Sequence, residues 1–302
     1  MTQLVELQRS LPDFERAGVA VFAISYDPAS VLADFANKHD ITYPLLTDEG
    51  SHVIRALGLL NEHIAEQHGY YGRPKRNYHQ GTPYPGIFVL DEHGVIVEKQ
   101  FEQSYRVRPA AAPLVELSFG GESTLPSVMA QASTGEIQVA ARISTSTYYT
   151  YQKLRLHLTI QIAPGLHVYG RPVPDGYTAL TVEIDPFKSL EVGPLELPEP
   201  HPFRIEGLDE NFLVHEGTIR GVLTLVLVED LSNLARLEQT HMAAKDQGQP
   251  REDVVIATRF RYQACSNQEC YPPREVTLQL PLAGLEHDWS NVPPGPDVSA
   301  LA

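Results

Sequence analysis

Only two cysteines occur in the chain, and they lie close together. Cys265 and Cys270 are separated by four residues and stand between two segments whose alternation is typical of strands. Two thiols at this spacing can form a disulfide with each other, either as a structural bridge or as a redox pair. A tetrahedral zinc site needs four ligands, and no histidine pair with ligand spacing lies nearby, so we predict no metal at this position.

The residues alone leave both roles of the disulfide open. A bridge that closes so short a loop contributes roughly 2 kcal/mol in the chain-entropy model, and bridges gain more between elements that are distant in sequence. A redox pair needs a reactive thiolate. No Lys or Arg lies within three residues of either cysteine, and Glu269 adjoins Cys270. Such a pair is expected to react slowly unless a partner thiolate attacks it.

Composition and charge narrow the classes of function. A chain of 302 residues is expected to hold about two domains. Its net charge of −15 argues against nucleic acid or an anionic membrane as partner, because phosphates would be repelled. The longest apolar run, residues 221–228, is far shorter than the roughly 18 residues needed to span a bilayer. We therefore expect no membrane insertion, and no motif indicates a cofactor.

The first 118 residues combine helix-like and strand-like patterns, which predicts an α/β domain. Residues 3–17 have a helical spacing of apolar side chains, interrupted at Pro12 and ended by Gly18. Residues 19–25 form a nearly continuous apolar run, which predicts a strand buried on both faces. A hairpin is predicted at residues 86–99. Further helices are predicted at 28–38, 51–59 and 110–117, and an extended piece at 43–46.

The pattern changes after residue 118. Residues 119–130 have the composition of a linker, residues 131–283 that of an all-β domain, and residues 284–302 that of a flexible tail. Alternating apolar segments separated by turn residues predict an antiparallel sandwich. The predicted strands are residues 137–143, 154–162, 180–184, 218–228, 254–262 and 275–282.

The cysteine segment resembles that of a known redox domain. Residues 262–265 (Tyr-Gln-Ala-Cys) and 270–273 (Cys-Tyr-Pro-Pro) are similar to the motif Tyr-Gln-x-Cys…Cys-Tyr-Pro-Pro of the N-terminal periplasmic domain of the thiol:disulfide interchange protein DsbD. Residues 165–171 resemble the strand whose aromatic side chains flank the disulfide in that family, and residues 208–212 resemble its cap loop. The resemblance extends over about residues 131–283.

This resemblance implies a fold and a set of roles. It implies an immunoglobulin-like sandwich in which Cys265 and Cys270 exchange disulfides with a thioredoxin-like protein partner. Cys270 would attack or be attacked, and Cys265 would be the resolving thiol. Tyr169 and Tyr271 would be flanking aromatics, and Phe212 would be the cap over the disulfide.

The chain departs from the family pattern at three points. Its cysteine spacing is one residue shorter, its cap loop carries an extra residue, and His167 stands where a tyrosine is expected. A non-catalytic binding module with a structural disulfide is therefore the alternative function.

Residues 1–118 resemble the thioredoxin-like redoxin family, which includes peroxiredoxins and TlpA-like thiol reductases. The resemblance rests on residues 18–27, 43–48 and 85–94. In that family a cis-proline precedes the hairpin, which makes Pro85 the candidate here. The chain begins at the helix that follows the family's first strand and reactive cysteine. We therefore expect no peroxide reduction by these 302 residues alone.

We expect the missing strand and cysteine to precede Met1 in a longer protein of the peroxiredoxin type, in an extracytoplasmic, periplasm-like compartment. A degenerate redoxin retained as a scaffold is the alternative. If Met1 is instead the natural start, the chain has no signal peptide and the expected compartment is the cytoplasm. The missing strand belongs between residues 19–25 and 86–90. Without it, these two strands would either pair directly or face each other with unpaired backbone groups.

Overall fold

The computed structural model describes residues 2–63, 81–102, 107–119, 123–204, 211–228 and 252–285. The described residues form two compact units. The first contains the described residues up to Leu125 together with Tyr151–Lys153, and the second contains Pro126–Thr150 and the described residues from Leu154 onward. Every described helix lies in the first unit. None of these helices is long and apolar enough to cross a membrane.

The first unit combines helices with two small sheets. Strand β1 pairs in parallel with β2, and β3 forms an antiparallel hairpin with β4. The helices are α1 (Thr2–Arg9), α2 (Leu11–Arg16), α3 (Ala29–Lys38), α4 (His52–Ala56) and α6 (Ala111–Ser118). The strands are β1 (Ala23–Ser25), β2 (Leu45–Thr47), β3 (Gly86–Leu90), β4 (Ile96–Phe101) and β5 (Arg108–Pro109).

Local sequence signals account for most of these elements. The predicted first helix breaks into α1 and α2, with Pro12 in the first turn of α2, and ends before Gly18, whose φ of 73° favours glycine. Helix α3 and the β3–β4 hairpin confirm their predictions. The core of the unit joins α2 to α6 through the buried side chains of Phe14, Leu114 and Val115.

The prediction that residues 19–25 form a strand buried on both faces is wrong. Strand β1 covers only Ala23–Ser25, and the side chains of Phe22 and Ile24 are 60% and 44% exposed. The physical reason is that β1 has only β2 as a neighbour among the described strands, and a strand in a two-stranded sheet is less covered than one inside a larger sheet. Within the described residues, β1 and β3 do not pair directly.

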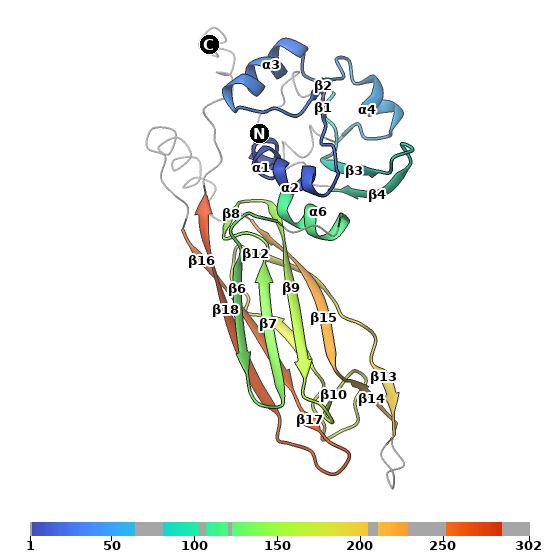
Figure 1. Cartoon of the computed structure of the whole chain (residues 1–302), viewed down its shortest axis with the longest axis vertical. Helices are drawn as coiled ribbons and strands as arrows, with labels where there is room; N and C mark the ends of the chain where they lie inside the picture. Colours follow the sequence, from blue (N-terminus) through green and yellow to red (C-terminus); the bar gives the residue numbers. More distant parts are fainter. Residues whose placement is uncertain are drawn as a thin grey trace. The chain divides into compact units, whose positions relative to one another are not determined.

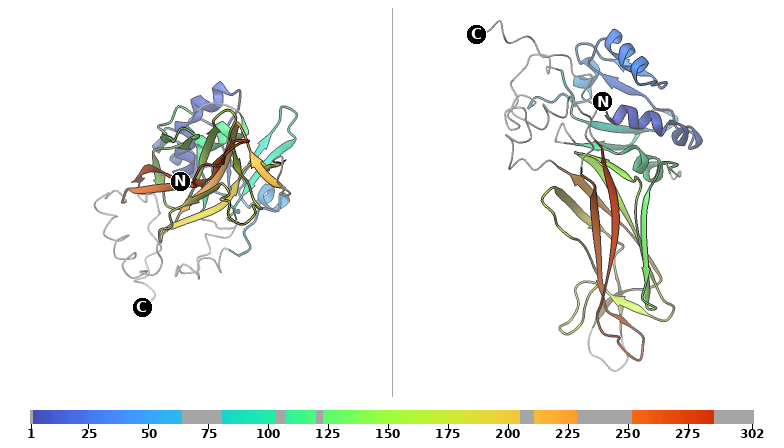
Figure 2. Two further views of the ribbon diagram at one scale, coloured as in Figure 1. Left: turned by 90° about the horizontal axis from the view of Figure 1, so that it is seen from below. Right: turned by 90° about the vertical axis from the view of Figure 1, so that its left-hand side faces the viewer.

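The second unit consists of long strands in layers (Figure 2). One sheet has the order β12-β15-β9-β7-β6, and another has the order β11-β16-β18-β8. A third and smaller sheet, β13-β14-β10-β17, lies at one end of the unit (Figure 1). The strands are β6 (Val128–Ser133), β7 (Ile137–Ile143), β8 (Thr147–Tyr149), β9 (Gln152–Ile162), β10 (His167–Tyr169), β11 (Thr181–Ile184), β12 (Leu190–Glu196), β13 (His201–Phe203), β14 (Phe212–His215), β15 (Thr218–Leu227), β16 (Val254–Tyr262), β17 (Ala264–Cys265) and β18 (Arg274–Leu285).

Period-two alternation explains the long strands. Along β9, every second side chain from Gln152 to Ile162 is buried, because successive side chains point to opposite faces of a sheet. All six predicted strands are confirmed, as β7, β9, β11, β15, β16 and β18. Of the small sheet, the strand expected at residues 165–171 from the family resemblance is present as β10, whereas β13, β14 and β17 were not predicted, because two to four residues carry too little alternation to be recognised.

Candidate functional site

The small sheet brings the predicted site residues together. Strand β10 pairs antiparallel with β14 on one side and with β17 on the other. The register places His167 opposite Cys265. Residues directly opposite each other on antiparallel strands share a face, and so do residues two apart on one strand. The side chains of His167, Tyr169 and Cys265 therefore gather on one face of this sheet.

Cys265 and Cys270 form a disulfide across a tight turn. The Ser266 N–H donates a hydrogen bond to the Glu269 carbonyl at 2.8 Å, which closes the turn. Cys265 is 0% exposed, whereas Cys270 is an exposed residue. The two halves of the disulfide therefore differ in their accessibility to an attacking group.

The Tyr169 side chain lies next to the exposed cysteine. Its hydroxyl oxygen is 3.4 Å from Cys270 Sγ, although Tyr169 itself is 0% exposed. A hydroxyl at this position can donate a hydrogen bond to a thiolate on Cys270. The structure thus places this predicted flanking aromatic directly against the disulfide.

Phe212 belongs to the buried aromatic cluster around Cys265. Its ring centroid is 5.3 Å from that of Tyr169 and 5.1 Å from that of Tyr177, and Phe212 is 1% exposed. Val214 completes this disulfide cluster, against which Val173, Tyr177 and Phe203 pack. Residues 208–210 of the predicted cap loop lie outside the described residues.

Gln263 and Tyr271 anchor the chain on either side of the turn. The Gln263 side-chain amide accepts a hydrogen bond from the Thr178 N–H at 3.0 Å and donates one to the Tyr271 carbonyl at 3.1 Å. Tyr271 is half-buried, and its hydrogen bond to Glu269 and the charge of that carboxylate raise the pKa of the Tyr271 hydroxyl. Gln263 is therefore a positioning residue; it belongs to the Tyr-Gln-Ala-Cys motif, but the motif alone does not indicate this role.

His167 is buried on the same face as the disulfide. It is 1% exposed, and its ring centroid lies 4.4 Å from that of Phe203 and 5.6 Å from that of Tyr169. Desolvation lowers the pKa of this imidazole below its ordinary value; the Glu216 carboxylate opposes the shift and His201 adds to it. The neutral imidazole is therefore the form favoured in the folded protein.

Histidine and acidic side chains do not assemble a metal site here. Within the described ranges, no group of three or more His, Cys, Asp or Glu residues could hold a metal ion. The described site consists of a disulfide, an aromatic cluster around it and a buried histidine.

A cavity of about 760 Å³ lies beside the disulfide cluster. Val173 and Tyr177 pack against the cluster and also line the cavity. The remaining lining residues come from the segment after β10 and from strands β11, β16 and β18. The cavity and the disulfide cluster thus share the side chains of Val173 and Tyr177.

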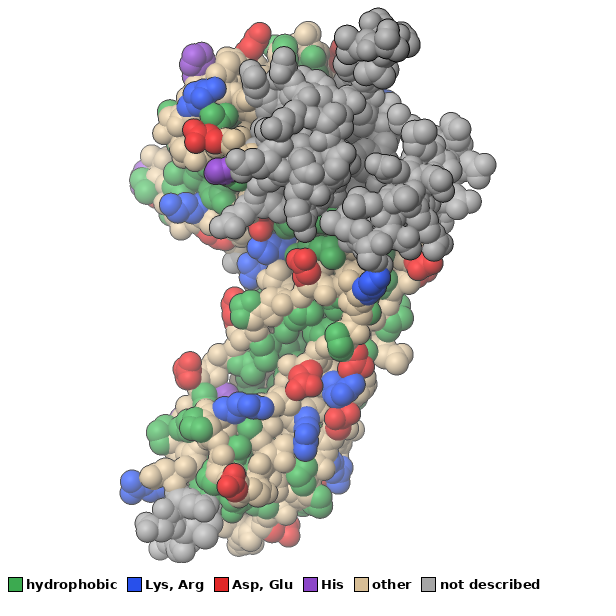
Figure 3. Space-filling model, turned by 180° about the vertical axis from the view of Figure 1, so that it is seen from behind, with side chains coloured by type: hydrophobic (Ala, Val, Ile, Leu, Met, Phe, Trp, Pro, Cys, Tyr) green, Lys and Arg blue, Asp and Glu red, His purple; other side chains and the backbone are tan. Residues whose placement is uncertain are grey.

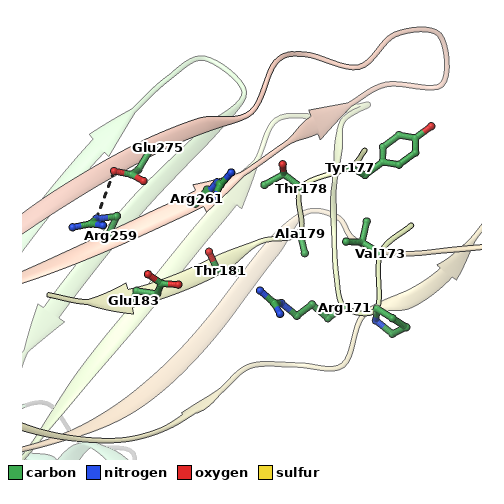
Figure 4. Close-up of a pocket in the computed structure, with 11 residues that line it drawn as sticks. Arg171, Val173, Tyr177, Thr178, Ala179, Thr181, Glu183, Arg259, Arg261 and Glu275 are labelled. Carbon is green, nitrogen blue, oxygen red and sulfur yellow. Dashed lines mark ion pairs between the residues drawn. The ribbon is translucent and has the colours of Figure 1, made fainter. Parts of the chain in front are cut away.

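Two of the three arginines that line the cavity are available to a ligand. Arg259 forms ion pairs with Asp185 and, at 3.5 Å, with Glu275, the second of which is drawn in Figure 4. Arg171 and Arg261 have no ion-pair partner in the part of the chain that the structure describes. On the face of this unit seen in Figure 3, basic and acidic side chains are interspersed. The two guanidinium groups without described ion-pair partners are thus confined to the cavity and do not belong to a larger basic patch on this face.

The prediction of a cis-proline at Pro85 is wrong. Among the described residues, the cis peptide bond is Arg171–Pro172. The Pro85 carbonyl accepts a hydrogen bond from the Glu102 N–H at 2.9 Å, which ties the start of β3 to the end of β4. Both cysteines of the chain belong to the second unit, so the Pro85 segment has no thiol of its own unit to contact.

Comparison with protein families gives two matches along the chain. Residues 1–99 match the AhpC/TSA family, and residues 134–282 match the family described as thiol:disulfide interchange protein DsbD, N-terminal. Together with the disulfide, these matches place the chain in the thiol–disulfide class of proteins. It contains an AhpC/TSA redoxin domain with a thioredoxin-like fold, followed by a DsbD N-terminal domain with an immunoglobulin-like fold, which confirms both the resemblances and the predicted fold class.

Curated relatives share part of their length with this chain. A protein of Mycobacterium tuberculosis whose name places it among the peroxiredoxins (Rv2521) is 33% identical over 99 residues, which are 33% of this chain and 57% of that protein. Alkyl hydroperoxide reductase E of the same organism is 32% identical over 108 residues, which are 35% of this chain and 60% of that protein. The chain thus spans about three-fifths of the length of these relatives.

Two solved structures show similarity to the chain. The N-terminal periplasmic domain of ScsB from Proteus mirabilis is 16% identical over 51% of this chain and 51% of that chain, with a TM-score of 0.32. The N-terminal domain of DsbD from Neisseria meningitidis, in the reduced form, is 13% identical over 43% of this chain and 77% of that chain, with a TM-score of 0.25. These scores are too low to support conclusions about the site.

Proposed function

We propose that the second domain exchanges disulfides with a thioredoxin-like dithiol protein through Cys265 and Cys270. The observation that carries this proposal is the unequal burial of the two cysteines: Cys265 is enclosed by the aromatic cluster, whereas Cys270 is exposed. Exchange through a mixed disulfide requires one sulfur that a partner can reach and a second that resolves the intermediate. A purely structural bridge has no need of this difference.

Exchange begins at Cys270. A partner thiolate attacks Cys270 Sγ, the bond between the two cysteines breaks, and its electron pair leaves on Cys265 Sγ, which takes up a proton. The second partner thiol then attacks the partner's own sulfur in the mixed disulfide, so that Cys270 leaves as a thiolate and the partner is oxidised to a disulfide. The Tyr169 hydroxyl, 3.4 Å from Cys270 Sγ, stabilises this thiolate by donating a hydrogen bond.

The aromatic side chains restrict access to the pair. Phe212 is the proposed cap, because it packs in the cluster that contains Cys265 and is itself fully buried. Tyr169 and Tyr271 flank the disulfide on the side of Cys270. The cluster thereby shields the Cys265 sulfur, whereas a docked partner protein reaches the exposed Cys270.

The cavity beside the cluster supports docking of an acidic group of the partner. Arg171 and Arg261 line it without described ion-pair partners. A guanidinium group binds a carboxylate through two parallel hydrogen bonds, which fixes orientation as well as adding affinity. A carboxylate of the partner held there would orient the partner's thiol close to Cys270.

The proposed compartment is extracytoplasmic. A stable disulfide persists in oxidising compartments and is rare in the cytosol, and the ScsB domain similar to this chain is named as periplasmic. Labelling of intact cells with a membrane-impermeant thiol reagent, after mild reduction, tests this assignment. Labelling of Cys270 only after cell lysis would count against it.

The reduction potential of the Cys265–Cys270 disulfide tests the exchange function. Exchange predicts a potential in the range of known exchange proteins, about −230 to −120 mV, measured by equilibration with glutathione or dithiothreitol buffers. A value below about −300 mV marks a structural bridge and would support the alternative, a non-catalytic binding module.

Single cysteine variants add a second test of the mechanism. Cys265→Ser, mixed with the oxidised (disulfide) form of a thioredoxin-like protein, is expected to form a mixed disulfide through Cys270 that accumulates, because the thiol of this chain that would resolve it is gone. Cys270→Ser is expected to trap none, because the remaining thiol is buried. Equal trapping by the two variants would contradict the assignment of Cys270 as the reacting residue.

A further inference from the structure

One buried polar atom beside the disulfide has no described partner. His167 Nε2 is inaccessible to solvent and makes no hydrogen bond within the described residues. His167 stands directly opposite Cys265 in the β10–β17 pairing. Opposite residues of an antiparallel pair have Cβ atoms about 4.5–5.5 Å apart, which is within the reach of an imidazole ring and a sulfur atom.

Cys265 needs such a neighbour when it is reduced. Its side chain is 0% exposed, and burial away from positive charge disfavours the thiolate. No Lys or Arg lies within three residues of either cysteine. A resolving thiol that is fully buried cannot lose its proton directly to water, so a proton acceptor inside the cluster is required.

The groups that surround His167 leave it neutral and therefore able to accept a proton. On its own strand it meets the ring of Tyr169, and on β17 it faces Cys265. Among the described residues, His201 of β13 and Glu216, which follows β14, are the charged or titratable groups that act on it from the other strands. Burial lowers the pKa of His167 and outweighs the opposing effect of Glu216.

We propose that His167 accepts the proton of Cys265 when Cys265 resolves a mixed disulfide, and returns a proton to Cys265 in the reverse direction. This inference rests on the proposed exchange function and assigns a further residue to it. In the resolving step, the Cys265 S–H proton moves to His167 and the Cys265 thiolate attacks Cys270 Sγ. The bond between the two cysteines forms, the bond from Cys270 to the partner sulfur breaks, and the partner leaves as a thiolate. That thiolate takes up a proton from water, and His167 releases its own, so charge and electrons balance.

Oxidised glutathione is the probe, because it reacts in two steps that can be timed separately. The reduced protein first forms a mixed disulfide between glutathione and Cys270, and Cys265 then displaces the glutathione. Acid quenching followed by intact-protein mass spectrometry measures both species over time, between about pH 5.5 and 8.5. The key variant is His167→Phe, which retains an aromatic ring against Phe203 but has no ring nitrogen.

His167→Phe is expected to leave the first step unchanged and to slow the resolving step by at least about tenfold near neutral pH, because general base catalysis typically contributes that much or more. The rate of the resolving step is expected to vary little with pH in the natural protein and to rise steeply with pH in the variant. His167→Gln, which is polar but cannot accept a proton at these pH values, should behave in the same way and serves if the Phe variant does not fold. The control is His93→Gln, because His93 is an exposed histidine of the first unit.

The inference is overturned if His167→Phe resolves the mixed disulfide at the natural rate with the natural pH profile. It is also overturned if both steps slow equally, because that pattern indicates a general disturbance of the site. These outcomes differ from a failure of the proposed function, in which the natural protein itself would not form or resolve the mixed disulfide.

Discussion

Glu6 gives the first domain a stability that depends on pH. This carboxyl of α1 is almost completely buried, and it accepts hydrogen bonds from the Ala111 N–H at 2.9 Å and from the Gln152 side chain at 2.8 Å. Desolvation outweighs these bonds and raises the pKa of Glu6 from 4.5 to about 7. The folded state therefore binds a proton between these two pH values that the unfolded state has released.

The sign and size of the effect follow from linkage. Because the folded-state pKa is raised, stability is greatest below about pH 4.5 and is lost as the pH rises to about 7. Each pH unit in this window corresponds to about 1.4 kcal/mol, so the total is about 3 kcal/mol. The pKa values of Asp13 and Asp48 are lowered, so both carboxylates remain ionised throughout this window. They do not contribute to the change of the unfolding free energy with pH.

The perturbation is Glu6→Gln, which stays neutral at every pH and keeps an oxygen for the Ala111 N–H. Urea unfolding is followed at several pH values by the helical circular dichroism signal, which reports on the first domain because every described helix lies there. The free energy of unfolding of the natural domain is expected to fall by about 3 kcal/mol relative to the variant between pH 5 and 7.5. Parallel pH dependences of the two proteins would refute the reasoning.

Three further predictions concern the second domain. Phe212→Ala is expected to accelerate reduction of the disulfide by dithiothreitol and to cost about 3–5 kcal/mol of stability in urea unfolding. Phe260→Ala, in the buried part of β16, is the matched control, and equal acceleration by both variants would show that lost stability rather than a lost cap is responsible. Arg261→Glu is expected to slow the reaction with anionic glutathione but not with uncharged dithiothreitol; an equal effect on both rates would exclude an electrostatic role of the cavity. Gln263→Ala leaves the Thr178 N–H without its partner and is expected to destabilise the domain by about 1–3 kcal/mol, so an unchanged urea midpoint would contradict its positioning role.

Local signals in the sequence were enough to predict most of the elements. The hairpin of β3 and β4, the stop at Gly18 and the six long strands of the sandwich each depend on neighbouring residues of the chain. The prediction for residues 19–25 failed because burial of a strand depends on which elements lie beside it, and apolar composition alone does not reveal them. The prediction of a cis peptide bond at Pro85 was wrong for a related reason. The isomer of a proline bond is set by the residues packed around it, which the local sequence does not show.

The sequence by itself determined that any disulfide within this chain joins two nearby cysteines, in a motif with Tyr and Pro. The number and the spacing of the cysteines are properties of the covalent chain. Only the tertiary structure decided which of them is buried, which hydroxyl lies next to Cys270 and which imidazole stands opposite Cys265. Tyr169 and His167 lie about a hundred residues from the cysteines along the chain and reach them through the register of β10 with β17. Strand register depends on the packing of the whole sheet. The local pattern of residues therefore does not predict which residues of two strands lie opposite each other.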